Sequence, residues 1–489
     1  MAAERDIERG LPIPSHHQQQ QQFQRAESGK QEPPSPQEDN SSEEIEEDGG
    51  YAPIQVASPI SRRISRSSST ATSLGRARSN NGYGCDADDS NGDGNNDDDT
   101  ASPAPEEKDP YEIGWDDGDN DPLNPRSMPH WRKWVIVGIT SFGSFCVTNA
   151  SASYTASYAQ MDAEFGNSKL VATIGLSMFV LGIAMGPFWS PLAEFYGRRP
   201  IYLASLFLFM VWLIPSAVAQ NIATMNVARF FQGLAGSAFL SVSGGTVGDL
   251  FTRESMSLPM VIFSVAPFVG PATGPLLGGL INTWANWRWT HYVLLIWSAS
   301  LLVAVALFVP ETYHPVLLKR KAQRVRQETG DDRWKAPMEK TSKSVTRTVA
   351  YSLLRPFQLL IMEPMCLILD IYSAILLGVL YLFFGAFPLV FVNNHGFNLW
   401  QVGLTFMGLL VASIVAALST PFWHRLRYDL AEKRSQKTGV LKAEPEDQLP
   451  PVILGAPLIT AGLFLFGFTT YPWVHWIFPI IGSGIFGLG

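Results

Sequence analysis

The chain has little cysteine, no apolar stretch near its start and no phosphate-binding loop. Cys85, Cys146 and Cys366 are the three cysteines in 489 residues, too few for a disulfide framework. No apolar run precedes about residue 132, so we expect no cleavable signal peptide and expect the first membrane helix to direct targeting. The pattern Gly-x-x-x-x-Gly-Lys-Ser/Thr does not occur, which argues against direct use of ATP. We predict no enzyme activity, no cofactor, no metal site and no nucleic-acid partner.

The distribution of charge divides the chain into two parts, which the mean hydropathy and net charge of the whole chain do not distinguish. A mean hydropathy of +0.06 and a net charge of −8 are ordinary for a soluble protein. However, residues 1–130 hold 27 of the 44 acidic but only 11 of the 36 basic side chains. Low hydrophobicity combined with high charge prevents a core from forming. We therefore predict a disordered tail over residues 1–130 and a membrane domain after it.

Two features of the tail suggest a function. Asp89 to Asp97 follow the first positions of a calcium-binding loop, but position 12 is Thr100 instead of glutamate and no helix-forming sequence flanks the loop. We interpret this stretch as a solvated acidic run. Arg62 and Arg63 precede Ser65 in an arrangement that basophilic kinases prefer, so Ser65 is a candidate phosphorylation site and a kinase a candidate partner.

Ten apolar segments with few charges after residue 131 are long enough to cross a bilayer, whose core of roughly 30 Å needs about 20 residues of helix. The fold class is therefore an all-α polytopic membrane protein. The segments divide into an N-terminal six-helix bundle at 131–310 and a C-terminal bundle of about four helices at 358–489, around a basic linker at 311–357. The predicted spans are 132–156, 170–192, 200–220, 226–248, 258–281, 289–309, 364–391, 400–421, 450–470 and 473–489.

Lysine and arginine are concentrated in alternate loops, and this bias sets the orientation of a membrane protein. Arg198, Arg199 and Arg253 lie on the side of the tail together with the linker, whereas the opposite loops offer little beyond Lys169 and Arg288. We therefore expect the amino terminus to lie in the cytoplasm and the predicted spans to lie in a lipid bilayer. We place the protein in the plasma membrane rather than the vacuole.

The fifth predicted span contains a regular glycine pattern. Gly270, Gly274 and Gly278 recur every four residues, so they share one face and allow a neighbouring helix to approach to backbone distance. Pro271 and Pro275 remove hydrogen-bond donors from this helix and predict a bend. Kinked, closely packed membrane helices are typical of proteins whose helices move around a cavity, so the pattern favours transport.

Charges at membrane depth are costly and usually mark function. Arg229, in the fourth span, begins a stripe of small residues at steps of four, although a side chain near the end of a span can also extend to the interface. Asp370, in the seventh span, is either a proton carrier or a structural hydrogen-bonding group. We predict that Arg229 and Asp370 take part in proton coupling.

Polar residues follow one face of the first span at helical period. Such a stripe faces protein or water and not lipid, so it either lines a cavity or makes hydrogen bonds between helices. The candidate cavity residues, including one from the seventh span, are Ser144, Thr148, Asn149, Ser151 and Tyr372.

The turn after the second span combines a carboxylate, a glycine and two arginines. Glu194, Gly197, Arg198 and Arg199 fall within six residues, and Asp249 ends the fourth span on the same side. Charge-assisted hydrogen bonds between these groups can form in one conformation and break in another, so we predict a conformational latch. A positive cluster that only sets the topology is the alternative.

These motifs together resemble the major facilitator superfamily, and specifically the twelve-helix drug:proton antiporters of fungi. The turn at 194–199 is similar to the motif between helices two and three, although Ser190, Glu194 and Phe195 depart from its usual residues. Arg229 begins a stretch similar to the helix-four motif. The run from Gly270 to Gly279 is similar to the antiporter motif of helix five, which includes Gly270, Gly274, Pro275, Gly278 and Gly279 here.

The resemblance covers about residues 122–489. It implies two six-helix bundles, alternating access, and export of drugs, toxic metabolites or polyamines against a proton gradient. Because the family has twelve helices and about ten are present before Gly489, we expect a C-terminally incomplete chain. The alternatives are a non-transporting membrane sensor or scaffold that signals through the tail, or an inactive fragment.

Overall fold

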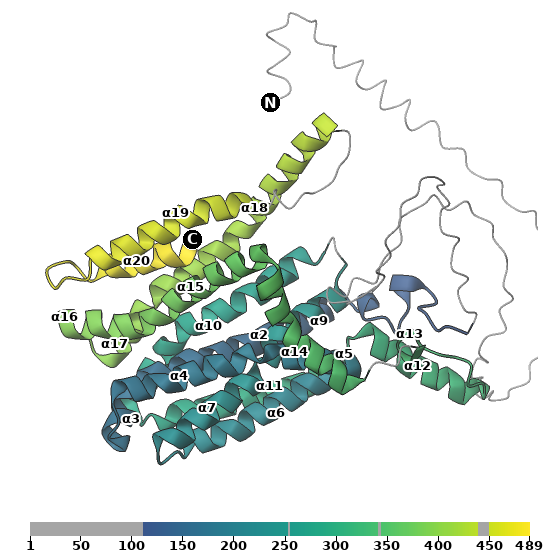
Figure 1. Ribbon diagram of the computed structural model, residues 1–489, viewed down its shortest axis with the longest axis horizontal. Helices are drawn as coiled ribbons and strands as arrows, with labels where there is room; N and C mark the ends of the chain where they lie inside the picture. The colour runs from purple at the N-terminus through teal and green to yellow at the C-terminus, as the bar shows by residue number, and fades with distance from the viewer. Residues whose placement is uncertain (1–110, 253–254, 341–343, 439–448) are drawn as a thin grey trace, which may run out of the picture. The chain divides into compact units, whose positions relative to one another are not determined.

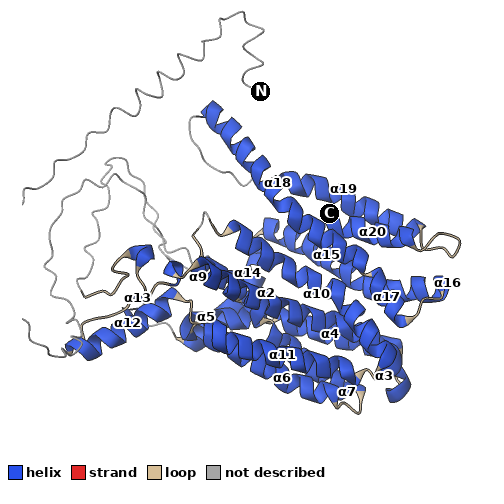
Figure 2. Ribbon diagram, turned by 180° about the vertical axis from the view of Figure 1, so that it is seen from behind, coloured by secondary structure: helices blue, strands red, loops and turns tan. Residues whose placement is uncertain are grey.

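A computed structural model describes residues 111–252, 255–340, 344–438 and 449–489, and these are almost entirely helical (Figures 1 and 2). They belong to one compact unit of the chain, Arg78–Gly489. Most of the predicted tail lies outside the described residues, and so do the candidate phosphorylation site Ser65 and the acidic run from Asp89 to Asp97.

The helices follow one another closely along the chain. Their bounds are α2 (His130–Ser153), α3 (Tyr158–Phe165), α4 (Lys169–Ala184), α5 (Trp189–Tyr196), α6 (Arg198–Ala217), α7 (Ile222–Gly236), α8 (Ala238–Ser241), α9 (Ser243–Leu250), α10 (Ser257–Trp284), α11 (Arg288–Phe308), α12 (His314–Thr329), α13 (Pro337–Lys340), α14 (Val345–Met362), α15 (Pro364–Phe387), α16 (Asn393–His395), α17 (Leu399–Thr405), α18 (Met407–Thr438), α19 (Leu449–Phe468) and α20 (Ile477–Leu488). Short 3₁₀ or π turns are η2 (Gly118–Asn120), η3 (Pro125–Ser127), η4 (Tyr154–Ser157), η5 (Gly186–Phe188) and η6 (Pro388–Val392).

Eight helical segments within the described residues are long and apolar enough to cross a membrane. They correspond to eight of the ten predicted spans, and apolar side chains cover much of their exposed surface, as lipid contact requires. The chain is therefore an integral membrane protein with several spans. The other two predicted spans, the fourth at 226–248 and the tenth at 473–489, do not form single helices of membrane-spanning length.

The fourth span is divided into α7, α8 and α9, with breaks at Ser237 and Val242. Its sequence is rich in glycine and serine, which are weaker helix formers than the leucine and alanine of the other spans. The tenth span begins later than predicted, because Pro472 lies in the turn after α19 and α20 starts only at Ile477. Within this sequence, α20 comprises twelve residues.

The spanning helices form two groups that meet along α10. In the N-terminal group, α10 packs on α2, α4 on α7, and α6 on both α7 and α11. In the C-terminal group, α20 packs on α18 and α19. The long helix α10 also contacts α17 and α18, and both views show it lying between the two groups (Figures 1 and 2). It is thus one of the elements through which the groups touch.

Residues 111–129 are ordered, although disorder was predicted as far as residue 130. They form turns and the short helices η2 and η3 beside α12 and α13. Ile113, Asp121 and Asn124 are buried there, so this stretch gains from contacts that a free tail lacks. We call residues 111–129 the clasp.

Candidate functional site

Arg229 is completely enclosed by protein. It lies on α7 with no exposed surface, and its guanidinium donates to the carbonyl oxygens of Ala150 at 2.9 Å and Ser151 at 3.0 Å, both on α2. Its central carbon lies 4.4 Å from the ring centre of Tyr154 and 4.3 Å from that of Phe179. These partners are carbonyl oxygens and ring faces, which hold a cation without cancelling its charge.

Ser151 connects Arg229 to the other helix group. Its carbonyl oxygen accepts from Arg229, while its hydroxyl lies 3.1 Å from the hydroxyl of Tyr381 on α15. A single residue therefore separates the buried cation from the C-terminal group. The sequence contains no signal that distinguishes Tyr381 from the other aromatic residues of its span.

The polar stripe of the first span is buried between helices. Ser144 donates to the carbonyl oxygen of Phe239 on α8 at 2.9 Å, and Asn149 donates to the Thr273 hydroxyl on α10 at 3.0 Å. Thr148 donates to the carbonyl oxygen of Ser144 at 3.0 Å within its own helix. The Ser144 and Asn149 bonds thus connect two helices each, whereas the Thr148 bond stays within α2.

Gly270, Gly274 and Gly278 face α2 at backbone distance. A methyl group on Gly270 would collide with the Thr148 side chain. One on Gly274 would lie 2.6 Å from the Cβ of Ala152, and one on Gly278 would lie 2.6 Å from a backbone oxygen of α2. The glycine face predicted from the sequence is thus a contact within the N-terminal group.

Gly279 serves a different contact, between the two groups. A Cβ added there would lie 2.9 Å from the Leu399 carbonyl oxygen of α17, and one added to Gly403 would lie 2.7 Å from the carbonyl oxygen of Pro275. The helix α10 continues through Pro271 and Pro275, and the bend stays a prediction. The antiporter-like run therefore packs on α2 with one face and on α17 with another.

The predicted latch residues gather where α6 begins and α9 ends. The Arg198 Nε lies 3.1 Å from the Asp249 Oδ2, with 8% and 5% of the two side chains exposed. Gly197 has φ +100°, a backbone conformation that glycine adopts without strain. We call this end of the helix groups the latch end and the opposite end the far end.

Glu311 completes the latch, and the sequence prediction missed it. Its carboxylate accepts hydrogen bonds from the N–H groups of Arg198 at 2.8 Å and Arg199 at 3.3 Å, which open α6. It also accepts from Thr312 at 3.1 Å and Tyr313 at 3.0 Å. A carboxylate at a helix N-terminus satisfies unpaired N–H groups and faces the positive end of the helix dipole. The available signal was a lone acid directly after the sixth span.

Replacing Glu311 with glutamine is expected to lower the thermal stability of the protein, because an amide accepts more weakly and brings an N–H₂ group toward four N–H donors. Hydrogen bonds to a charged group contribute about 1.5–3 kcal/mol each, so the loss should be measurable. Heating followed by size-exclusion chromatography of the fluorescently tagged protein gives the midpoint. The control is Glu328→Gln, an exposed glutamate of α12. Equal midpoints for both variants would contradict the capping role.

The remaining predicted site residues are Arg199, next to Arg198 at the latch, Glu194 on α5, and Asp370 and Tyr372 on α15. Arg199 donates to the carbonyl oxygen of Ala306 at 2.7 Å, and Glu194 is half-buried on α5. Asp370 and Tyr372 are exposed on α15. Asp370 precedes Tyr381 by eleven residues, about 16 Å of helix, so it is well separated from the contact that leads to Arg229. Among the described residues, no group of three or more His, Cys, Asp or Glu is placed to bind a metal.

Two hollows lie along α10 toward the latch end. One has a volume of about 520 Å³ between α10 and α18, and its lining includes Met256, Met260, Thr420 and His424. The other, of about 590 Å³, is bounded by apolar side chains of α2, α10 and α18. Volumes of this size accommodate small organic molecules. Across the first hollow, the hydroxyl of Ser257 lies 3.2 Å from the His424 ring.

Comparison with known proteins identifies relatives across most of this region. Residues 140–489 match the family model of the Major Facilitator Superfamily. The chain is 50% identical over 373 residues to the efflux pump atB of Aspergillus terreus. This alignment covers 76% of this chain and 71% of that protein. The chain is 37% identical over 372 residues to the efflux pump FUBT of Fusarium oxysporum, covering 76% of this chain and 62% of that protein. It is 36% identical over 386 residues to the probable drug/proton antiporter YHK8 of Saccharomyces cerevisiae, covering 78% of this chain and 74% of that protein.

Proposed function

The chain belongs to the major facilitator superfamily and, within it, to the fungal drug:proton antiporter family, and we propose that it exports small molecules by proton-driven alternating access. In this cycle the N-terminal and C-terminal helix groups rock against each other, so that a site between them opens to one side at a time. The proposed substrates are drugs, toxic metabolites or polyamines.

The uneven contact between the helix groups supports this cycle and is the observation that carries the proposal. Toward the far end, Gly279 and Gly403 bring α10 and α17 to backbone distance, and Ser151 meets Tyr381. Toward the latch end, a hollow of about 520 Å³ lies between α10 and α18. The helix groups are thus in close contact at the far end and separated by a hollow at the latch end. A transporter that works by alternating access requires such an arrangement in the state that is open to one side.

Proton coupling is proposed to act through Arg229. Its Nε has no hydrogen-bond partner among the described residues, so the guanidinium keeps one donor available inside a closed site. Through Ser151 the same cation is linked to Tyr381 of the opposite helix group. A change of charge near Arg229 would therefore alter the contact that joins the two groups. Asp370, exposed on α15, is proposed as a second proton-exchanging group.

The latch end is proposed to face the cytoplasm. Arg198, Arg199 and the basic linker lie there, as the bias of positive residues toward the cytoplasmic side predicts. The plasma membrane is the proposed location, because export of toxic compounds from the cell requires it. A proton crossing such a membrane carries about 2.3 kcal/mol per 100 mV, in addition to the pH difference.

Flux measured in lipid vesicles tests this proposal. The purified protein is placed in vesicles with an acidic interior, and the uptake of fluorescent drugs and labelled polyamines is followed. We expect uptake that stops when a protonophore collapses the gradient and resumes when the gradient is restored. Uptake that is insensitive to the protonophore would contradict proton coupling. The absence of uptake for every compound, together with unchanged growth of cells lacking the gene on the same compounds, would contradict export.

Removal of residues 1–110 separates the transporter from a sensor that signals through its tail. These residues precede every contact described above. We expect the shortened protein to keep its flux, because the helix groups, Arg229 and the latch are all retained. A protein without flux in either form, but with a cellular response that depends on the tail, would instead support the sensor.

A further inference from the structure

The clasp is bound to the linker between the helix groups by backbone and apolar contacts. The Ile113 N–H donates to the Lys335 carbonyl oxygen at 3.1 Å, and the Lys335 N–H donates to the Tyr111 carbonyl oxygen at 3.1 Å. The Ile113 side chain is buried against Ala322 of α12 and Ala336 beside α13. This contact covers an apolar surface of the linker with a segment that lies about 200 residues earlier in the chain.

Lys321 of α12 adds an ionic contact to the clasp. Its ammonium lies 3.1 Å from the Gly114 carbonyl oxygen, 2.9 Å from the Asp116 carboxylate and 3.0 Å from that of Asp121. Burial alone would raise the pKa of Asp121, but the Leu123 N–H, the Lys321 ammonium and the Asp116 N–H lower it overall. Burial alone would lower the pKa of Lys321, but the two carboxylates raise it overall. Both groups are therefore charged at neutral pH, and their hydrogen bonds are of the stronger, charge-assisted kind.

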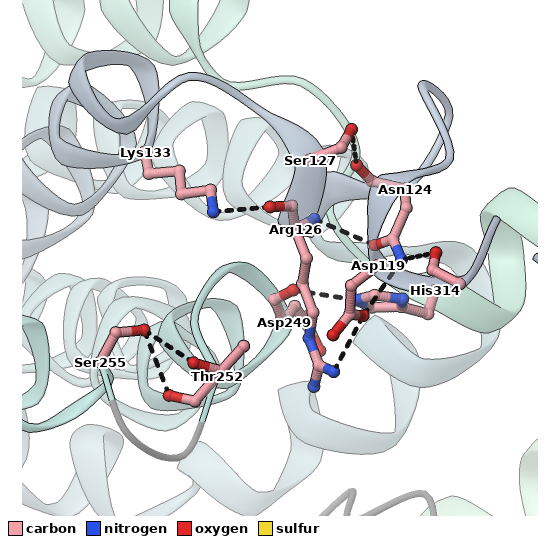
Figure 3. A network of polar contacts seen from close by, with 10 residues as sticks. Asp119, Asn124, Arg126, Ser127, Lys133, Asp249, Thr252, Ser255 and His314 are labelled. Atoms are coloured by element: carbon pink, nitrogen blue, oxygen red, sulfur yellow. Dashed lines mark hydrogen bonds and ion pairs between the residues drawn. The ribbon is translucent and has the colours of Figure 1, made fainter. Parts of the chain in front are cut away.

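The other end of the clasp is fixed to the first spanning helix. In Figure 3, the Lys133 side chain of α2 extends to the carbonyl oxygen of Arg126, at 2.7 Å. The Arg126 N–H donates to the Asn124 side chain at 3.0 Å, and the Asn124 amide donates to the Gly118 carbonyl oxygen at 2.9 Å. The clasp thus bridges α2 and the linker.

Between these two anchors, the clasp reaches the latch through His314. The Trp115 ring meets the edge of the His314 ring with centres 5.8 Å apart. The His314 Nε2 lies 2.8 Å from the carbonyl oxygen of Asp249 (Figure 3). The carboxylate of this same Asp249 pairs with Arg198. A cavity of about 340 Å³ lies beside these rings, and Trp115 and His314 help to line it.

We propose that the clasp is an internal ligand of α12 and α13 that holds His314 against Asp249 and thereby keeps the latch engaged. While it is bound, the first half of the linker moves with the N-terminal helix group. When the clasp is released, His314 no longer contacts the Asp249 carbonyl oxygen. The position of Asp249 beside Arg198 is then no longer fixed by this contact. The proposed transport cycle is needed only for the effect on flux, because the contact itself can be observed without it.

Hydrogen exchange on the whole protein in lipid nanodiscs tests the contact. The amides of Ile113 and Lys335 donate across it, so they should be protected in the unmodified chain. Lys321→Met removes the ammonium but keeps an unbranched apolar side chain, and we expect it to speed exchange at both amides by at least about tenfold. Arg320→Met is the matched control, because Arg320 is the exposed neighbour on the same helix. Unchanged protection in Lys321→Met would overturn the proposal.

A peptide added in trans tests whether the clasp acts as a ligand. The protein that lacks residues 1–121 exposes the linker surface, and a synthetic peptide of residues 109–123 is added to it. We expect the peptide to restore protection of the Lys335 amide, and the same peptide with Ile113→Ser to fail, because Ile113 fills the apolar contact. Equal effects of the two peptides would show that the surface does not recognise the clasp, and would overturn the proposal.

Flux distinguishes control of the latch from a contact that only stabilises the linker. We expect Lys321→Met to change the rate of proton-driven flux at least about fivefold, in the range of typical coupling between sites, and Arg320→Met to leave it unchanged. Faster exchange with unaltered flux would overturn control of the latch. Absence of flux in the unmodified protein would count against the proposed function alone, since the exchange results stand without it.

Discussion

Arg229→Ala is expected to reduce proton-driven export at least about 100-fold, because hydrogen bonds to a charged group are worth about 1.5–3 kcal/mol each and two are lost. The variant loses the donors to the carbonyl oxygens of Ala150 and Ser151 and the cation between the Tyr154 and Phe179 rings. It therefore removes the group that is proposed to link proton binding to the contact between Ser151 and Tyr381. Flux into acidic vesicles, at equal amounts of inserted protein, measures the effect.

Two further variants show whether the geometry or only the charge of Arg229 is required. Arg229→Lys keeps the charge but lacks the planar fork that fits between two rings and donates to two oxygens, so we expect it to retain only part of the flux. Lys169→Ala removes an exposed cation at the start of α4 and should leave flux unchanged. Full activity of Arg229→Ala would remove this residue from the mechanism.

Gly274→Ala is expected to destabilise the protein, by on the order of 1–3 kcal/mol, the usual cost of adding a methylene to a filled contact. The new methyl group would lie 2.6 Å from the Ala152 Cβ and 2.8 Å from the Ser153 nitrogen, so α2 and α10 must move apart. Gly274→Leu enlarges the collision and should prevent folded protein from accumulating. The melting midpoint and the yield of monodisperse protein measure the two effects.

The matched control for this prediction is Gly385→Ala on α15. No atom lies within 4 Å of a Cβ added there, so the substitution meets open space. Alanine is a better helix former than glycine by roughly 1 kcal/mol, so this variant should be as stable as the unmodified protein or more stable. A loss of stability of similar size at both positions would show that the close contact of α10 with α2 is not what Gly274 provides.

Most of the membrane architecture could be predicted from the sequence, because each span depends on the length and composition of its own segment. Eight predicted spans have a long apolar helix, and the glycine face of α10 does lie against another helix. The prediction failed where local helix propensity competes with hydrophobicity. Ser237 and Val242 interrupt the fourth span, and Pro472 delays the start of α20.

The candidate site was only partly predictable. Arg229 was identified because a cation within an apolar run is conspicuous, and Arg198 and Asp249 because they lie at the ends of neighbouring spans. Glu311 was missed although it accepts four backbone hydrogen bonds, because an acid after a span is an ordinary feature of a loop. The clasp was predicted to be disordered, since its composition resembles that of the tail and its partners on α12 and α13 are distant in the chain.

The sequence by itself determined that this protein resides in a membrane, that eight of its segments form long apolar helices, and that one helix has a face of glycines, because each property depends on consecutive residues. Only the tertiary structure decided that Glu311 caps α6, 113 residues earlier in the chain, and that Ser151 meets Tyr381, 230 residues later. A hydrogen bond requires particular atoms at about 3 Å, and the folded arrangement of the helices alone brings such distant atoms together.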